Sequence, residues 1–317
     1  MPNTFNKVFK HAGDIHLSQS VSLIGSIKSC WVDSEVGILI SDPILSEVKI
    51  YDFNGKLIKL LGGRGEGPGE FQSPFGIFSD DKFIYITDPR LRRVSVFDKR
   101  DLKFKRQFKI DDARDIRVVG GDFFIVAPYL FKDKFYSLHI YSKNGEKLKS
   151  VLPTPDIVIK NNFISDGISI DCDDYGYIYL IHEMEYKIYK LNRNGDIVAK
   201  FYGKNEKYIA PPREPFRDFF SRERIKRWAE SWTHVDRLVV LRKAGLIIVS
   251  LASFNPNKFM IDIYDLNGNL IYGGIETRYR LYCADKEDNL YFIERVEEAG
   301  GFNFIIKKYR FAGDVKK

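Results

Sequence analysis

The sequence predicts an all-β fold, a six-bladed β-propeller whose blades are four-stranded antiparallel sheets. Three observations lead to this prediction. A hairpin signal after an aromatic-aliphatic run recurs six times, usually at intervals near 45 residues. A short, very apolar strand precedes each of these hairpins. Aromatic residues make up 15% of the 317 residues, and flat side chains pack well on pleated strands.

The hairpin signals set the repeat length. Asn-Gly is the favoured two-residue hairpin turn because both positions need positive φ, and it stands at Asn54-Gly55, Asn144-Gly145, Asn194-Gly195 and Asn267-Gly268. The six equivalent turn positions are separated by 46, 44, 50, 73 and 45 residues and lie at Gly55, Asp101, Gly145, Gly195, Gly268 and Gly313. A period of about 45 residues is the size of one four-stranded propeller blade.

The apolar strands before the hairpins are expected in the middle of each blade, because a run that is apolar on both faces fits between neighbouring blades. They occupy residues 37–40, 83–86, 123–126, 177–181, 246–249 and 290–293. Only four residues follow Gly313, too few for the outer strand of the last blade. Residues 15–23 alternate as a strand does, so we expect them to supply that strand and close the ring.

We expect one domain over residues 1–317, with a helical insertion at about 203–233 before the fifth blade. Within the insertion, Ser221 is a favourable helix N-cap. An apolar stripe at helical spacing follows it, made of Ile225, Trp228, Ala229 and Trp232. Two interpretations stay open, a helix that covers apolar surface of the propeller and a lid or docking helix over one face.

Composition narrows the function classes. The formal net charge of +7 is spread along the chain, which fits either a solvated basic surface or attraction to an acidic partner. The three cysteines, Cys30, Cys172 and Cys283, have neither zinc spacing nor a CxxC pair, and we interpret them as buried structural thiols.

The sequence was searched for membrane-spanning and signal-peptide segments. No stretch approaches the roughly 20 apolar residues of a membrane-spanning helix. Residues 1–13 lack the apolar segment of a signal peptide, so the protein is either cytoplasmic or exported with its signal already removed. Of these two, we favour an extracytoplasmic location, in the periplasm or at the cell surface.

The stretch GRGEGPGEFQSPFGI at residues 63–77, followed by FIYITDPRLRRVSVFD, resembles the NHL-type repeat of six-bladed β-propellers from bacteria such as Bacteroidetes. The resemblance covers nearly the whole chain and departs from the pattern in the third blade, where Pro128-Tyr129 stands where an Asp is expected. The resemblance implies a six-bladed propeller fold, but its motifs specify no catalytic or binding chemistry. NHL relatives include RNA-binding modules and a lyase with metal-bound histidines, whereas the histidines here do not fall at equivalent positions in neighbouring blades.

Candidate site residues come from the loops that meet at one face of a propeller, at the mouth of its channel. The loops entering the inner strands contribute Asp115, Asp166, Asp236, Arg237 and Arg280. The glycine turn and the loops between second and third strands contribute Arg64, Asp88, Arg90 and Glu294. This mixed charge indicates either ion pairs between blades or an anionic ligand, whose carboxylate, sulfate or phosphate would suit Arg90, Arg237 and Arg280.

His182, followed by Glu183 in a predicted loop at this face, is the candidate catalytic pair, since a general base needs a carboxylate partner and a substrate proton within reach. The other interpretation is an ordinary hydrogen-bonded loop histidine. We predict no cofactor or metal, because no metal-binding histidine spacing occurs, although carboxylates converging on the channel leave Ca²⁺ open. The glycine turn lacks the GK[ST] ending of a phosphate-binding loop.

A complete propeller without a catalytic signature favours a non-enzymatic binding protein. We expect a monomer that recognises a protein or a polar or anionic ligand, including a glycan, at its charged face. A lyase or hydrolase acting on a polar substrate through His182 or channel carboxylates is the alternative. RNA binding through basic loops and the helix at 222–227 comes third, because few exposed aromatics accompany those basic residues.

Overall fold

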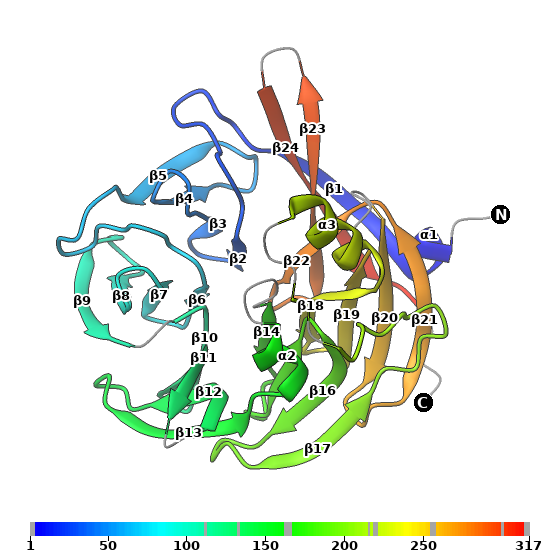
Figure 1. Ribbon diagram of the computed structural model, residues 1–317. Helices are drawn as coiled ribbons and strands as arrows, with labels where there is room; N and C mark the ends of the chain where they lie inside the picture. The colour runs from blue at the N-terminus through cyan, green and yellow to red at the C-terminus, as the bar shows by residue number, and fades with distance from the viewer. Residues whose placement is uncertain are drawn as a thin grey trace.

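Six four-stranded antiparallel sheets stand around a central axis in the computed structural model of this chain, which confirms the predicted fold class (Figure 1). Each sheet runs outward from an inner strand near the axis to an outer strand at the rim. The structure describes residues 4–110, 113–131, 134–161, 167–214, 216–217, 221–253, 258–298 and 301–313.

The strands of each blade follow one another in the chain from inside to outside. Blades 1 to 3 consist of β2 (Ser29–Asp33), β3 (Gly37–Asp42), β4 (Glu47–Tyr51) and β5 (Leu57–Gly62), then β6 (Ile77–Ser79), β7 (Phe83–Asp88), β8 (Arg93–Asp98) and β9 (Phe104–Lys109), then β10 (Asp115–Val119), β11 (Asp122–Phe131), β12 (Lys134–Tyr141) and β13 (Lys147–Pro153).

Blades 4 and 5 repeat this order, and blade 6 takes its outer strand from the N-terminus. They consist of β14 (Ile168–Cys172), β15 (Ile178–His182), β16 (Glu185–Leu191) and β17 (Ile197–Tyr202), then β18 (His234–Leu241), β19 (Leu246–Ala252), β20 (Phe259–Asp265) and β21 (Leu270–Thr277), then β22 (Arg280–Ala284), β23 (Asn289–Glu298), β24 (Gly301–Phe311) and β1 (Phe9–His16).

The N-terminal strand closes the ring as predicted, but it lies earlier in the chain than expected. β1 pairs antiparallel with β24, so the last blade contains strands from both ends of the sequence. The predicted range 15–23 overlaps β1 only at Ile15 and His16. Residues from Ser18 onward leave the sheet as a loop, whereas Phe9 is fully buried and packs on the last blade.

The Asn-Gly hairpins differ from the predicted two-residue turns. Their glycines have φ between +78° and +85°, whereas no described Asn has positive φ. The strand register shifts by one residue beside each turn, as in a three-residue loop with a β-bulge. A side chain two residues before the Asn accepts the Asn backbone N–H and stabilises this loop, at Asp52, Ser142, Asn192 and Asp265.

The core lies between neighbouring blades. All six residues of β3 and all five of β15 are buried, as expected for second strands that are sandwiched on both faces. The apolar clusters combine side chains of adjacent blades, and one cluster joins blade 6 to blade 1 across the closure of the ring. Packing between blades therefore fixes the positions of the inner strands.

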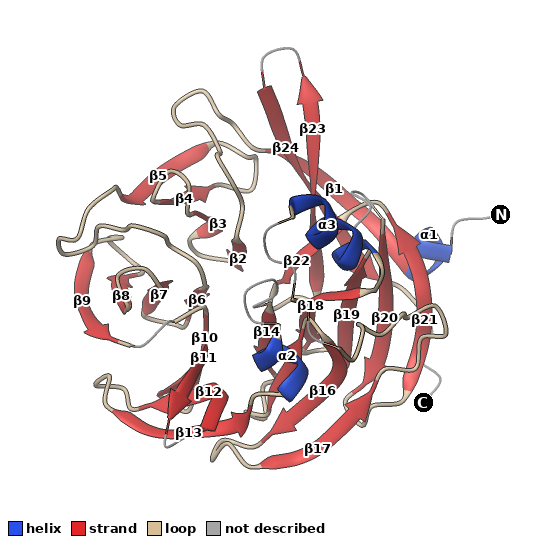
Figure 2. Ribbon diagram, in the orientation of Figure 1, coloured by secondary structure: helices blue, strands red, loops and turns tan. Residues whose placement is uncertain are grey.

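Within the described residues, three helices accompany the blades (Figure 2). They are α1 (Thr4–Val8), α2 (Asp156–Lys160) and α3 (Arg222–Glu230). The predicted helix of the insertion is confirmed as α3, where the Ser221 hydroxyl accepts the N–H of Arg224. Trp232 is buried against Val158 and Met184, with Trp228 packed beside them, so the insertion covers apolar surface. No helix in the described ranges is long and apolar enough to cross a bilayer.

Closure by β1 gives a first prediction. Phe9→Ala should lower the free energy of unfolding by about 3–5 kcal/mol, because it empties a fully buried aromatic site between the chain ends. Phe53→Ala, at a side chain that is 44% exposed, is the matched control and should cost much less. Urea denaturation measures both. Equal losses would show that β1 does not hold the last blade.

Candidate functional site

A buried carboxylate fixes the segment that enters the inner strand. Asp88, the last residue of β7, accepts the backbone N–H groups of Gln72 and Ser73 at 2.8 and 3.1 Å, and two more from its own turn. Asp42, at the end of β3, holds the entry to β2 in the same manner. Both side chains are fully buried. Asp88 therefore holds the backbone that leads to the mouth and does not line the mouth itself.

A cavity of about 310 Å³ lies where the inner strands begin, and all six blades contribute to it. We call it the mouth cavity. It contains four of the predicted ligand-binding residues and Glu183, together with three charged or titratable residues that the sequence reasoning did not select. Its charged and titratable lining is Lys28, Arg114, Asp115, Glu183, His234, Asp236, Arg237 and Arg280.

The other predicted residues lie elsewhere. The Arg64 guanidinium donates a hydrogen bond to the carbonyl of Ile44, and Arg90 is exposed outside the mouth cavity. Glu294 lines a neighbouring cavity of about 340 Å³ and pairs with Arg278 and Lys307 at 3.5 Å each. Asp166 lies outside the described residues.

The carboxylates of the mouth cavity already have cationic partners. Asp236 accepts a bidentate contact from Arg280, with nitrogen–oxygen distances of 2.6 to 3.1 Å. A register shift in β18 between Val235 and Arg237 marks a bulge at Asp236, and such bulges re-aim side chains. Asp115 pairs with Arg117 at 3.1 Å. The negative charges of Asp115 and Asp236 are thus compensated by neighbouring arginines.

Two cations of the cavity meet aromatic rings instead. The Lys28 Nζ lies 4.5 Å from the ring centre of Phe75, and the Arg237 guanidinium lies 5.9 Å from that of Tyr282. Neither side chain has an ion pair or hydrogen bond with the described residues, and the Arg237 Nε is buried. A guanidinium or ammonium over an aromatic face keeps its charge available to an anion.

The electrostatics of Lys28 reflect this excess of positive charge. Burial within the mouth lowers the pKa of Lys28, and the charges of Arg237, Arg280 and Arg114 lower it further, while Glu183 opposes them. Although water reaches the Lys28 side chain, protein surrounds it on several sides. An anion bound here would relieve the mutual repulsion of these cations.

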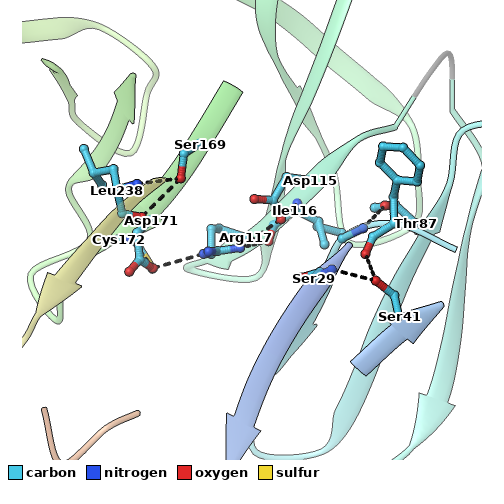
Figure 3. Close-up of polar contacts among 12 residues, drawn as sticks. Ser29, Ser41, Thr87, Asp115, Ile116, Arg117, Ser169, Asp171, Cys172 and Leu238 are labelled. Carbon is cyan, nitrogen blue, oxygen red and sulfur yellow. Dashed lines mark hydrogen bonds and ion pairs between the residues drawn. The ribbon is translucent and has the colours of Figure 1, made fainter. Parts of the chain in front are cut away.

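Below the mouth, polar contacts join neighbouring blades (Figure 3). The buried Arg117 spans from blade 3 to blade 4, with its Nε 3.0 Å from Asp171 and its guanidinium over the Trp31 ring. The Ser41 hydroxyl donates a hydrogen bond to the carbonyl of Phe75. The Ser169 hydroxyl donates to the Leu238 carbonyl and accepts the Leu238 N–H. The cavity beneath the mouth has a volume of only about 10 Å³, so a ligand would enter and leave from the mouth side.

His182 is not positioned as a general base. It ends strand β15, is fully buried, and lines neither the mouth cavity nor the neighbouring one. Burial, aided by the charge of Lys187, lowers its pKa to about 3. Neither ring nitrogen has a hydrogen-bond partner among the described residues. His182 is therefore a neutral core residue within the range of pH in which proteins normally fold.

His234 takes the position beside Glu183 that the sequence reasoning gave to His182. Its Nδ1 lies 2.6 Å from Glu183, and its Nε2 lies 2.9 Å from the carbonyl of Ala229 in the last turn of α3. Trp232 stacks on the imidazole with ring centres 3.6 Å apart. Both ring nitrogens of His234 therefore lie within hydrogen-bond distance of a protein oxygen. His234 thus fastens the insertion to the mouth.

Two signals in the sequence pointed to the residues that were missed. Lys28 immediately precedes the first inner strand, so the entry rule used for the later blades also selects it. His234 is the first residue after the insertion and starts β18. Among the described residues, no group of three or more His, Cys, Asp or Glu side chains is placed to hold a metal ion.

The chain matches one known family. The model of a family described as 6-bladed beta-propeller matches residues 18–209. No curated protein matches the chain in sequence.

Solved structures share the fold at low identity. A Bacteroides fragilis protein, described provisionally as exported, has a TM-score of 0.71 at 11% identity, and the match covers 97% of this chain and 96% of that one. A Bacteroides vulgatus protein has a TM-score of 0.66 at 10% identity, covering 96% and 99%. Virginiamycin B lyase from Staphylococcus aureus has 0.55 at 11%, covering 96% and 90%. At these identities the likeness concerns the fold alone.

The buried His182 predicts an acid sensitivity. In the unfolded chain His182 binds a proton below about pH 6.5, whereas in the folded chain its lowered pKa delays protonation until about pH 3. The contribution of neutral His182 to the free energy of unfolding is at its maximum above pH 6.5. Below that pH it falls by up to about 1.4 kcal/mol per pH unit. His182→Leu should flatten this slope in urea denaturation series, and His16→Leu, at an exposed site, should leave it in place. An unchanged slope in His182→Leu would contradict the assignment.

The contact of His234 with α3 predicts a change in protease sensitivity. His234→Ala removes the hydrogen bond between Nε2 and the Ala229 carbonyl of α3, worth about 0.5–1.5 kcal/mol, so local opening of α3 should increase roughly two- to tenfold. Trypsin cleavage within residues 222–227, followed by mass spectrometry, measures that opening. His11→Ala removes a histidine contact on the outer strand β1, where His11 meets Asp14, and is the control. Equal cleavage rates in both variants would show that His234 does not fasten α3.

Proposed function

The chain belongs to the family described as 6-bladed beta-propeller, and we propose that it is a binding protein that holds an anionic group in its mouth cavity. The observation that supports this function is the division of charge in the cavity. Asp115 and Asp236 are paired with arginines and Glu183 with His234, whereas Lys28 and Arg237 meet only aromatic rings among the described residues.

The chemistry of these groups favours a carboxylate, sulfate or phosphate. Arg237 offers a planar fork of donors that matches such anions, and Lys28 adds a compact charge. A cavity of about 310 Å³ with a closed floor suits one acidic sugar unit, or the acidic end of a larger molecule. The polar lining disfavours an apolar ligand.

Two further parts of the proposal concern the family type and the location. We assign the blades to the NHL type on the stretch at residues 63–77 and the Asp that follows the second strand, now seen at Asp42 and Asp88. We also place the protein outside the cytoplasm. The description of the similar Bacteroides fragilis protein agrees with that location.

A lyase or hydrolase at the mouth is the weaker candidate. Its proposed base, His182, is buried away from the cavity, and both ring nitrogens of His234 already face protein acceptors. A general base has to reach a substrate proton directly or through one water. The geometry therefore supports binding better than proton transfer.

Isothermal titration calorimetry with glucuronate, sulfate and phosphate tests the function, with glucose as the uncharged control. We expect at least one anion to bind and glucose not to bind. Lys28→Gln and Arg237→Gln should each weaken binding about tenfold or more, since a hydrogen bond to a charged group is worth about 1.5–3 kcal/mol. Lys56→Gln, at an exposed hairpin lysine, should leave affinity unchanged. Binding of none of the anions, or an equal loss in Lys56→Gln, would contradict the proposal.

The lowered pKa of Lys28 predicts how anion affinity depends on pH. Only protonated Lys28 attracts an anion, so affinity should fall as the pH rises through a pKa that lies below the usual value for lysine. Lys28→Arg keeps its charge throughout this range and should flatten the profile. The same titrations between pH 7 and 10 measure both proteins. Parallel profiles would show that Lys28 does not contact the anion.

A further inference from the structure

Two of the three cysteines lie in contact although 253 positions separate them in sequence. The Sγ atoms of Cys30 and Cys283 are 3.2 Å apart. Both side chains are buried in the apolar cluster that joins blade 6 to blade 1. Cys172 is also buried, but its sulfur contacts Arg242 and not another cysteine.

Closure of the ring brings the two thiols together. Cys30 lies on β2, the inner strand of the first blade, and Cys283 lies on β22, the inner strand of the last blade. A register shift between Leu281 and Cys283 marks a bulge at Tyr282, which sets the direction of the side chains that follow it. The contact therefore exists only when the first and last blades meet.

We propose that Cys30 and Cys283 form a disulfide bond that joins the first and last blades. A disulfide has its sulfurs about 2.05 Å apart, so the observed contact requires a movement of about 1 Å. The interior of the cluster is apolar and contains no third cysteine. This cross-link would add a covalent closure near the axis to the strand closure by β1 at the rim.

The oxidant is a disulfide of the thiol–disulfide exchange class, either oxidised glutathione or a protein disulfide. One cysteine thiolate attacks it, forms a mixed disulfide and releases the first thiol of the oxidant. The second cysteine thiolate then attacks the mixed disulfide and releases the second. Two cysteine thiols lose two protons and two electrons, and the oxidant disulfide is reduced to two thiols.

The step belongs to folding and not to the finished ring. Burial raises the pKa of the Cys283 thiol well above its usual value, so thiolate is scarce in the packed protein. Before the last blade docks, both thiols are open to solvent and can attack the oxidant. Compartments outside the cytoplasm supply oxidants of this class. The inference does not depend on the anion site.

Cysteine counting tests the proposal. The full chain is refolded with oxidised and reduced glutathione, then unfolded in urea and alkylated without reductant, and its intact mass is measured. We expect one alkylated cysteine, Cys172, and a linked peptide pair containing Cys30 and Cys283. Cys172→Ser is the matched control and should give no alkylation with the same linked pair. Cys30→Ser and Cys283→Ser should each give two alkylated cysteines.

A thermal measurement gives a second readout. The oxidised protein should unfold at a higher temperature than the protein unfolded and refolded in dithiothreitol, because the cross-link constrains a very long loop of the unfolded chain. Cys172→Ser should keep this difference and Cys30→Ser should lose it. Three alkylated cysteines after oxidative refolding, or a linked pair that contains Cys172, would overturn the proposal. The number of alkylated cysteines in the wild-type protein tests the proposal even if a variant fails to fold.

Discussion

The position of each inner strand depends on how its entry segment is held, and in two blades a buried carboxylate does this. Asp42 and Asp88 each accept backbone N–H groups from the segment before the inner strand and from their own turn. A buried side-chain oxygen that accepts several backbone N–H groups is a strong local restraint. The mouth cavity is built from such entry segments, so its shape follows from these restraints and from packing between blades.

The charged residues of the mouth divide into two groups with different roles. Arg280 with Asp236 joins blade 6 to blade 5, and Arg117 with Asp171 joins blade 3 to blade 4. These contacts are the ion pairs between blades that were one of the two interpretations of the mixed charge. Lys28 and Arg237 have no such partner among the described residues, and they carry the binding interpretation. The two interpretations thus apply to different residues of one cavity.

Local signals allowed most of the fold to be predicted. Asn-Gly turns, apolar second strands and the cap at Ser221 depend on residues close in sequence, and each specifies its element. The exact position of β1 depends on contacts with the far end of the chain, so its range was misplaced. His182 was placed in a loop because β15 ends one residue later than its apolar run indicates. The contact of Cys30 with Cys283 arises only through closure of the ring.

The central claim is that uncompensated positive charge in the mouth cavity holds an anion. Crystals soaked in selenate, a sulfate analogue with strong anomalous scattering, test this claim directly. The account predicts an anomalous peak within hydrogen-bond distance of both Lys28 and Arg237. Peaks confined to the outer surface, with none in the mouth cavity, would contradict it.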